Sequence, residues 1–248
     1  MRILVFVSVF CLSFGSALAE ARIFNLTKEK FASYLVMNYG TSRVGDDLFR
    51  GESAATDYSE ALNANLGGEF GFVSMMGPMS LRFGFEILKP APLKGVEARD
   101  PGGSTLYEIS SDVTGFVPKF GMDLNVVTRP SYRVFAYGAI GQAHLTVKNE
   151  YTNLTVAPNA DFTTEMRSSS RSLSGGLGVE YAAFDLTSVV LEVGYRQLQF
   201  KKLTYGAAVT DTRGAHDAGD KATLDTGEDR TLDFSGWTVS LGARWWLF

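Results

Sequence analysis

Apolar and polar residues alternate at every second position over long stretches of this chain, and this pattern restricts the fold more than any other feature. A period of two is typical of a β-strand whose two faces lie in different surroundings. Most of the stretches exceed the five or six residues of an average strand and suit a tilted bilayer crossing. There are eight of them, at residues 30–43, 61–73, 79–90, 110–127, 132–148, 170–184, 188–204 and 231–248.

The segments between these stretches are alternately short and long. Three are tight turns, at Ser74–Pro78, Thr128–Ser131 and Asp185–Thr187. Four are long and polar, at residues 44–60, 91–109, 149–169 and 205–230. Short turns at one end and long loops at the other are the layout of outer-membrane β-barrels, which place the turns in the periplasm and the loops outside.

The two faces of the predicted strands differ sharply in chemistry. One face carries no charge and is rich in large apolar residues; in the fifth strand we assign every second residue from Phe135 to Val147 to it. The opposite face carries charges spaced by glycines. The apolar face is too bulky to fill the interior of eight strands, whereas a glycine-rich charged face suits a narrow lumen. This favours a membrane barrel over a soluble barrel with its apolar face inside.

The N-terminus has the pattern of a secretory signal. A positive start at Arg2 is followed by an apolar run over residues 3–14 and by the small residues Ala17 and Ala19. The run is too short to span a bilayer as a helix. We therefore predict a cleaved signal peptide over residues 1–19, which holds the only cysteine, Cys11. Residues 20–248 are predicted to form one domain of the all-β class, an eight-stranded antiparallel up-and-down transmembrane β-barrel.

The chain resembles the small eight-stranded bacterial outer-membrane barrels of the OmpA-barrel, OmpX and OmpW type. The resemblance covers residues 20–248 and rests on the signal, the eight strands, stretches such as Gly176–Tyr181 and Glu192–Arg196, and the terminal Phe248. It implies a monomer in the Gram-negative outer membrane that contacts lipids and lipopolysaccharide and is inserted by the barrel-assembly machinery. One feature departs from the family: Phe248 shares its face with Trp246 and Arg244, out of phase with the apolar series.

The candidate site is a charged network on the lumen face. We expect two stacked layers, with Glu69 paired to Arg82 across the first short turn. Across the last short turn, Glu180 is expected to face Glu192, a like-charge pair that needs a cation from Arg196 or Arg244. The predicted network consists of Glu69, Arg82, Glu86, Lys119, Asp123, Glu180, Glu192, Arg196 and Arg244.

Two functions fit such a network. It can be a structural plug that fills the lumen and fixes the strand register, in a barrel whose role is structural or mediated by its surface loops. Alternatively, it can gate a narrow, porin-like path for ions or small solutes. The lumen of eight strands is just wide enough for side chains, which favours the plug. A lipid A-modifying enzyme is a third, less favoured possibility.

No catalytic, cofactor or metal site is predicted. His144 is assigned to the lumen face beside Gln142 and Thr146, without a serine partner, and His216 lies alone in the last loop. A lipid-modifying enzyme would need a histidine with a serine or acid partner near the outer leaflet. The acidic loop 205–230 lacks the spacing of a calcium-binding loop, so we expect its carboxylates to be exposed to solvent. The alternative is that they bind a divalent cation that bridges to lipopolysaccharide. The formal net charge of −4 argues against nucleic-acid binding.

Overall fold

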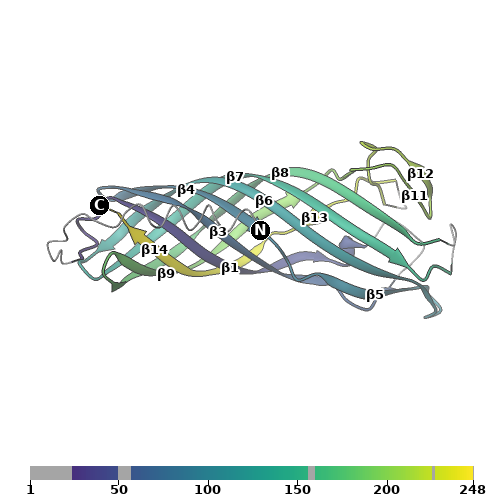
Figure 1. Ribbon diagram of the computed structural model, residues 1–248, viewed down its shortest axis with the longest axis horizontal. Helices are drawn as coiled ribbons and strands as arrows, with labels where there is room; N and C mark the ends of the chain where they lie inside the picture. Colours follow the sequence, from purple (N-terminus) through teal and green to yellow (C-terminus); the bar gives the residue numbers. More distant parts are fainter. Residues whose placement is uncertain (1–23, 50–56, 156–159, 225–226, 248) are drawn as a thin grey trace, which may run out of the picture.

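The computed structural model describes residues 24–49, 57–155, 160–224 and 227–247 (Figure 1). The predicted signal peptide and Phe248 lie outside these residues. The described elements are the 3-10 helix η1 (Asp46–Leu48) and fourteen strands. The strands are β1 (Phe31–Gly45), β2 (Asp57–Tyr58), β3 (Leu62–Met76), β4 (Met79–Leu88), β5 (Leu93–Arg99), β6 (Thr105–Thr128), β7 (Tyr132–Thr152), β8 (Phe162–Phe184), β9 (Thr187–Phe200), β10 (Thr204–Tyr205), β11 (Val209–Asp211), β12 (Gly214–His216), β13 (Leu232–Asp233) and β14 (Gly236–Trp246).

Eight of these strands close into a ring. The hydrogen-bonded order is β1–β3–β4–β6–β7–β8–β9–β14, and β14 pairs back with β1 in antiparallel register from Ala32 opposite Trp246 to Gly40 opposite Thr238. Closure gives every strand a partner on both sides, which satisfies the backbone N–H and C=O groups without help from solvent. The predicted eight-stranded antiparallel barrel is therefore confirmed. Among the described residues, no helix is long and apolar enough to cross a membrane.

The first short turn is tighter than predicted. β3 continues to Met76 and β4 starts at Met79, so only Gly77 and Pro78 form the turn. Gly77 has a φ of 66°, which matches the first central residue of a two-residue II′ hairpin turn. The pairing that follows sets Glu69 opposite Glu86 and Val73 opposite Arg82. The predicted pairing of Glu69 with Arg82 is wrong, because it assumed a longer turn.

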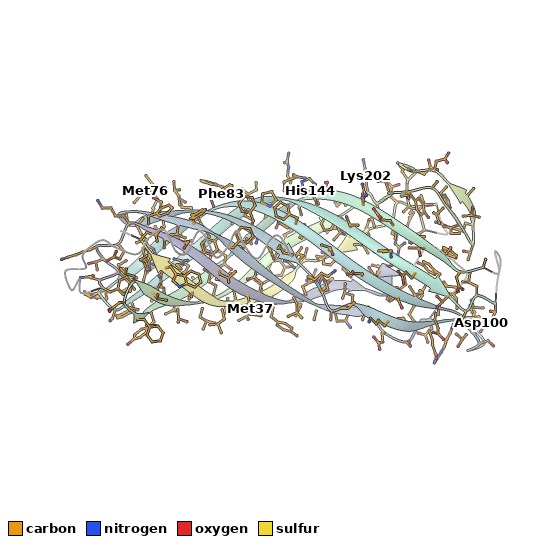
Figure 2. The ribbon with its side chains drawn as sticks, viewed as in Figure 1. Met37, Met76, Phe83, Asp100, His144 and Lys202 are labelled. Carbon is orange, nitrogen blue, oxygen red and sulfur yellow. The ribbon has the colours of Figure 1, made fainter. Side chains whose placement is uncertain are left out.

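A belt of exposed apolar side chains surrounds the barrel on its short-turn half (Figure 2). Leu177, near the middle of the belt, is 65% exposed. Aromatic residues gather at its two edges, with Tyr132, Tyr181 and Trp245 near the short turns and Trp237 toward the loops, as in the aromatic girdles of membrane barrels. The belt includes Leu35, Met37, Phe70, Phe72, Leu81, Phe83, Phe120, Met122, Leu124, Ile140, Val179, Leu191, Val193, Val239 and Leu241.

The face assignment of the fifth strand is wrong. In β7, Arg133, Phe135, Leu145 and Val147 are buried inside the barrel, whereas Ile140 is half exposed on the outside. The inward aromatic ring is accommodated by glycine: a Cβ on Gly178 would lie 2.3 Å from Phe135 Cζ. The same inversion moves Gln142, His144 and Gly138 from the lumen to the outer surface.

The long-loop end of the barrel has an apolar interior. β6, β7 and β8 run 24, 21 and 23 residues, well past the belt, so parts of the segments predicted as loops are strands. β5, predicted as loop, pairs with β6. Because water replaces lipid beyond the belt, apolar side chains turn inward there, as in a soluble barrel. This core includes Val44, Leu48, Phe49, Leu88, Val96, Tyr107, Ile109, Val113, Leu145, Val147, Tyr151, Met166, Leu198, Phe200, Leu232 and Phe234.

The two ends of the barrel are predicted to lie on opposite sides of the outer membrane. Ser104, before β6, and Ser131, in the turn before β7, are both exposed. The only cysteine, Cys11, lies in the predicted signal peptide. With that segment cleaved as predicted, single Ser→Cys variants carry one reactive thiol each. A membrane-impermeant maleimide should label Ser104→Cys on intact cells and Ser131→Cys only after the cells are permeabilised. The reverse labelling pattern would contradict the orientation.

The belt should be intolerant of charge. Leu177→Arg places a guanidinium near mid-membrane and should cost about 2–4 kcal/mol in the free energy of unfolding. Thr163→Arg is the matched control, on the same face of β8 but beyond the belt and exposed, and should change stability by no more than about 0.5 kcal/mol. Urea unfolding in lipid vesicles measures both values. Equal losses would show that the belt does not face hydrocarbon.

Candidate functional site: the charged lumen

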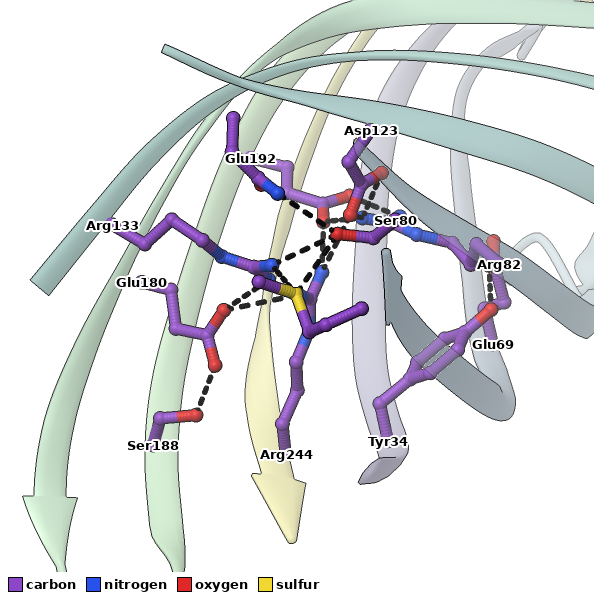
Figure 3. A network of polar contacts seen from close by, with 12 residues as sticks. Tyr34, Glu69, Ser80, Arg82, Asp123, Arg133, Glu180, Ser188, Glu192 and Arg244 are labelled. Carbon is purple, nitrogen blue, oxygen red and sulfur yellow. Dashed lines mark hydrogen bonds and ion pairs between the residues drawn. The ribbon is translucent and has the colours of Figure 1, made fainter. Parts of the chain in front are cut away.

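The layer of charge nearer the short turns joins five strands (Figure 3). Arg82 on β4 binds Glu192 on β9 through both terminal nitrogens, at 2.6 and 3.1 Å, and Asp123 on β6 at 3.1 Å. Arg244 on β14 lies 3.0 Å from Glu180 and 3.5 Å from Glu192. All five side chains are buried. A bidentate guanidinium–carboxylate pair is among the strongest polar contacts in a protein, so this layer ties opposite walls of the barrel together.

A sixth charge, Arg133 on β7, completes this layer and was missed by the sequence analysis. It forms an ion pair with Glu180 and donates a hydrogen bond of 3.1 Å to Ser80 Oγ. Glu180 also accepts a hydrogen bond from Ser188, and one of 3.1 Å from Trp246 Nε1. With Arg133 included, three arginines face three carboxylates, and the layer is electrically neutral.

The second layer lies toward the long loops. Lys119 on β6 bridges Glu69, at 3.1 Å, and Glu86. Arg196 on β9 lies 2.9 Å from the other oxygen of Glu86, and Tyr34 donates a 2.6 Å hydrogen bond to Glu69. Two cations thus face two anions, and the second layer is neutral too. Removal of any one partner would leave a buried charge uncompensated.

All nine residues of the predicted network meet in the lumen, but their partners differ from those predicted. Glu69 belongs to the second layer, and Arg82 instead binds Glu192 and Asp123. Glu180 lies opposite Val190, and Glu192 opposite Gly178. The predicted Glu180–Glu192 register is wrong because β8 carries a bulge between Ala182 and Phe184 before a two-residue turn. Arg244 still bridges the two carboxylates.

Aromatic rings and glycines fill the space around the charges. The Tyr34 hydroxyl lies where a side chain on Gly84 would sit, and the Tyr137 hydroxyl takes the same place over Gly194. The Arg82 guanidinium lies 5.6 Å from the Tyr34 ring centre and 5.4 Å from that of Tyr137, within cation–π range. The cavity between the layers has a volume of about 40 Å³. It has room for only a few water molecules.

The histidines lie outside this network. His144 is exposed on the outer surface, where Ser169 Oγ lies 2.9 Å from its Nδ1. Its predicted position on the lumen face, without a serine partner, is therefore wrong, because the phase of β7 was inverted. His216 stacks on Tyr205 and lies 3.2 Å from Asp211. Within the described ranges, no group of three histidine, cysteine or acidic residues is arranged to hold a metal.

The Arg82–Glu192 pair should show strong energetic coupling. Arg82→Gln and Glu192→Gln should each cost about 3–5 kcal/mol in the free energy of unfolding, since each leaves an orphan charge. The double variant should cost less than the sum of the two. The exposed pair Lys148–Glu150 is the control, with an expected coupling of about 0–1 kcal/mol. Urea unfolding in lipid vesicles measures both cycles; strict additivity at Arg82 and Glu192 would contradict the network.

The sequence matches no protein-family model and no curated protein. Several solved structures resemble the fold. A major outer membrane protein from Thermus thermophilus has a TM-score of 0.50 and 15% identity, over 87% of this chain and 99% of that one. OprG from Pseudomonas aeruginosa has a TM-score of 0.46 and 15% identity, over 90% and 98%. Ail from Yersinia pestis has a TM-score of 0.43 and 15% identity, over 88% and 98%.

These likenesses concern the fold, since the identities are low. The likeness to the Thermus thermophilus protein agrees with the architecture of this chain: a ring of antiparallel strands with an apolar belt outside and paired charges inside. Such a belt is stable only against hydrocarbon, and closed barrels are the β-structures that span membranes. The chain therefore has the fold of the bacterial outer-membrane β-barrels, with eight strands in the ring.

Proposed function

We propose that this barrel is an integral outer-membrane protein whose lumen is closed and whose role is structural or mediated by its long-loop end. One observation carries the proposal: in the described part of the chain, buried side chains occupy the interior of both halves of the barrel. Two neutral layers of ion pairs occupy the half inside the belt, and an apolar core occupies the half beyond it. Such a role needs no cofactor and no catalytic group, and we propose that the barrel is not an enzyme.

The charged layers oppose the passage of ions. Each cation in them already has a carboxylate within ion-pair distance, so a passing ion would have to break a buried pair. Breaking a buried pair costs about 3–5 kcal/mol. The cavity of about 40 Å³ supplies too little water to replace the lost contacts.

The apolar half provides a second seal. The segment around η1 packs into it, with Leu48 and Phe49 fully buried. Its backbone is held from two sides: Asn149 donates a 3.1 Å hydrogen bond to the Leu48 carbonyl, and Arg230 donates to the same oxygen. An ion crossing this region would leave water for a hydrocarbon-like interior, which is strongly unfavourable.

The long strands suit the presentation of a surface. β6, β7 and β8 carry the loops beyond the belt, and the β11–β12 hairpin adds a small separate sheet there (Figure 1). A rigid support lowers the entropy that a loop loses on binding, so these loops are suited to contact molecules outside the cell.

Recordings in planar bilayers test the closed lumen. The purified barrel should give no discrete conductance steps. The double variant Glu86→Ala and Arg196→Ala removes one ion pair of the second layer, and it should also stay silent because the apolar half remains sealed. Ion-selective steps in the unmodified protein, changed in selectivity by the double variant, would instead identify the network as the gate of a narrow channel and overturn the proposal.

A further inference from the structure

A group of basic and polar side chains lies on the outer wall of the barrel, where the apolar belt ends on the long-loop side. We call it the basic patch, and it consists of His144 on β7, Arg167, Ser169 and Arg171 on β8, and Lys202 just after β9. Figure 2 shows Phe83, His144 and Lys202 in this order along the barrel. The patch is therefore at the height where lipid headgroups begin.

The patch carries positive charge that the protein itself does not neutralise. Arg167 lies 2.7 Å from Glu165 and is balanced by it. Arg171 and Lys202 make no ion pair with any residue in the described part of the chain. Ser169 and His144 bond to each other and stay exposed, so both remain available as polar partners. Two exposed cations and two polar side chains suit a phosphate.

Two hollows in the outer wall follow one another along β7 and β8 at this patch. The upper one, of about 350 Å³, is lined by His144, Arg167, Ser169 and Lys202. The lower one, of about 360 Å³, has an apolar part formed by Phe83, Pro118, Phe120 and Ile140, and its other lining residues are Lys119, Gly141, Gln142 and Arg171. Gln142 and Arg171, which are opposite each other in register, lie at the upper edge of the lower hollow. A polar hollow thus lies directly above an apolar one.

We propose that these two hollows bind one anionic lipid of the surrounding leaflet. The phosphate occupies the upper hollow beside Lys202, with Arg171 below it, and an acyl chain fills the lower hollow. Guanidinium groups bind phosphate oxygens through paired N–H donors, and Lys adds a point charge. The apolar hollow gives a reason to favour a lipid over a free anion, which would leave it empty. The site lies outside the lumen, so it does not depend on whether the lumen conducts.

Native mass spectrometry of the whole barrel in detergent tests the site. Phosphatidylglycerol and phosphatidylcholine with the same acyl chains are the two probes, and glycerol phosphate is the probe without chains. The unmodified barrel should bind phosphatidylglycerol roughly tenfold more tightly than phosphatidylcholine, since each Lys or Arg near an anionic headgroup favours binding. Arg171→Gln combined with Lys202→Gln should abolish most of this preference.

A charge-matched control is available on the same barrel. Lys89→Gln combined with Lys148→Gln also removes two positive charges beyond the belt, but both lysines already pair with acids, Asp112 and Glu150. This control should keep the preference. Equal binding of the two lipids by the unmodified barrel overturns the proposal without any variant. An equal loss in the control, or binding of glycerol phosphate as tight as that of the lipid, overturns it too. Detection of a bound lipid that has lost one acyl chain would identify the Ser169–His144 pair as hydrolytic. That result would overturn the proposal of a site that only binds lipid.

Discussion

The closed ring of backbone hydrogen bonds is the constraint on which the rest of this structure depends. In hydrocarbon an unpaired peptide group costs several kcal/mol, so the last strand has to return to the first. β14 meets β1 over nine consecutive residue pairs, from Ala32 to Gly40. Closure with eight strands then fixes a narrow interior, and within the belt the side chains alternate between that interior and the lipid except at bulges. Charges that point inward are paired with each other and with polar side chains of the same lumen.

The inner and outer surfaces of the barrel exchange polarity along its length. Within the belt, Leu177 and its neighbours face lipid while Glu180 and Arg244 are paired inside. Beyond the belt, Leu145 and Val147 are buried while Lys148 and Glu150 are exposed. The strands and their period of two continue unchanged; only the outer solvent changes, from hydrocarbon to water. A single barrel therefore combines a membrane half with a half built like a soluble protein.

This exchange of polarity explains which features of the fold could be predicted from the sequence. The period of two gives the number of strands and most of their faces, because it reports local surroundings directly. The register between neighbouring strands could not be predicted in the same way. It depends on the turn at Gly77 and on the bulge near Ala182, and the alternation of apolar and polar residues reports neither. The face of β7 was misjudged because its inward residues are apolar in both halves. Arg133 was the available signal, since it shares a face with Phe135 and would otherwise lie in lipid.

The two interiors of this barrel are maintained by different forces. The half beyond the belt, which we call the head, is therefore stabilised independently of the membrane half. The head around Phe49, Tyr107 and Phe200 has an apolar core of its own, whereas the membrane half is held by ion pairs and by lipid. A change in loop sequence that keeps those core residues leaves the ion pairs of Arg82 and Lys119 unchanged. The sequences of the long loops can therefore diverge repeatedly while the transmembrane half keeps its ion pairs and its fold.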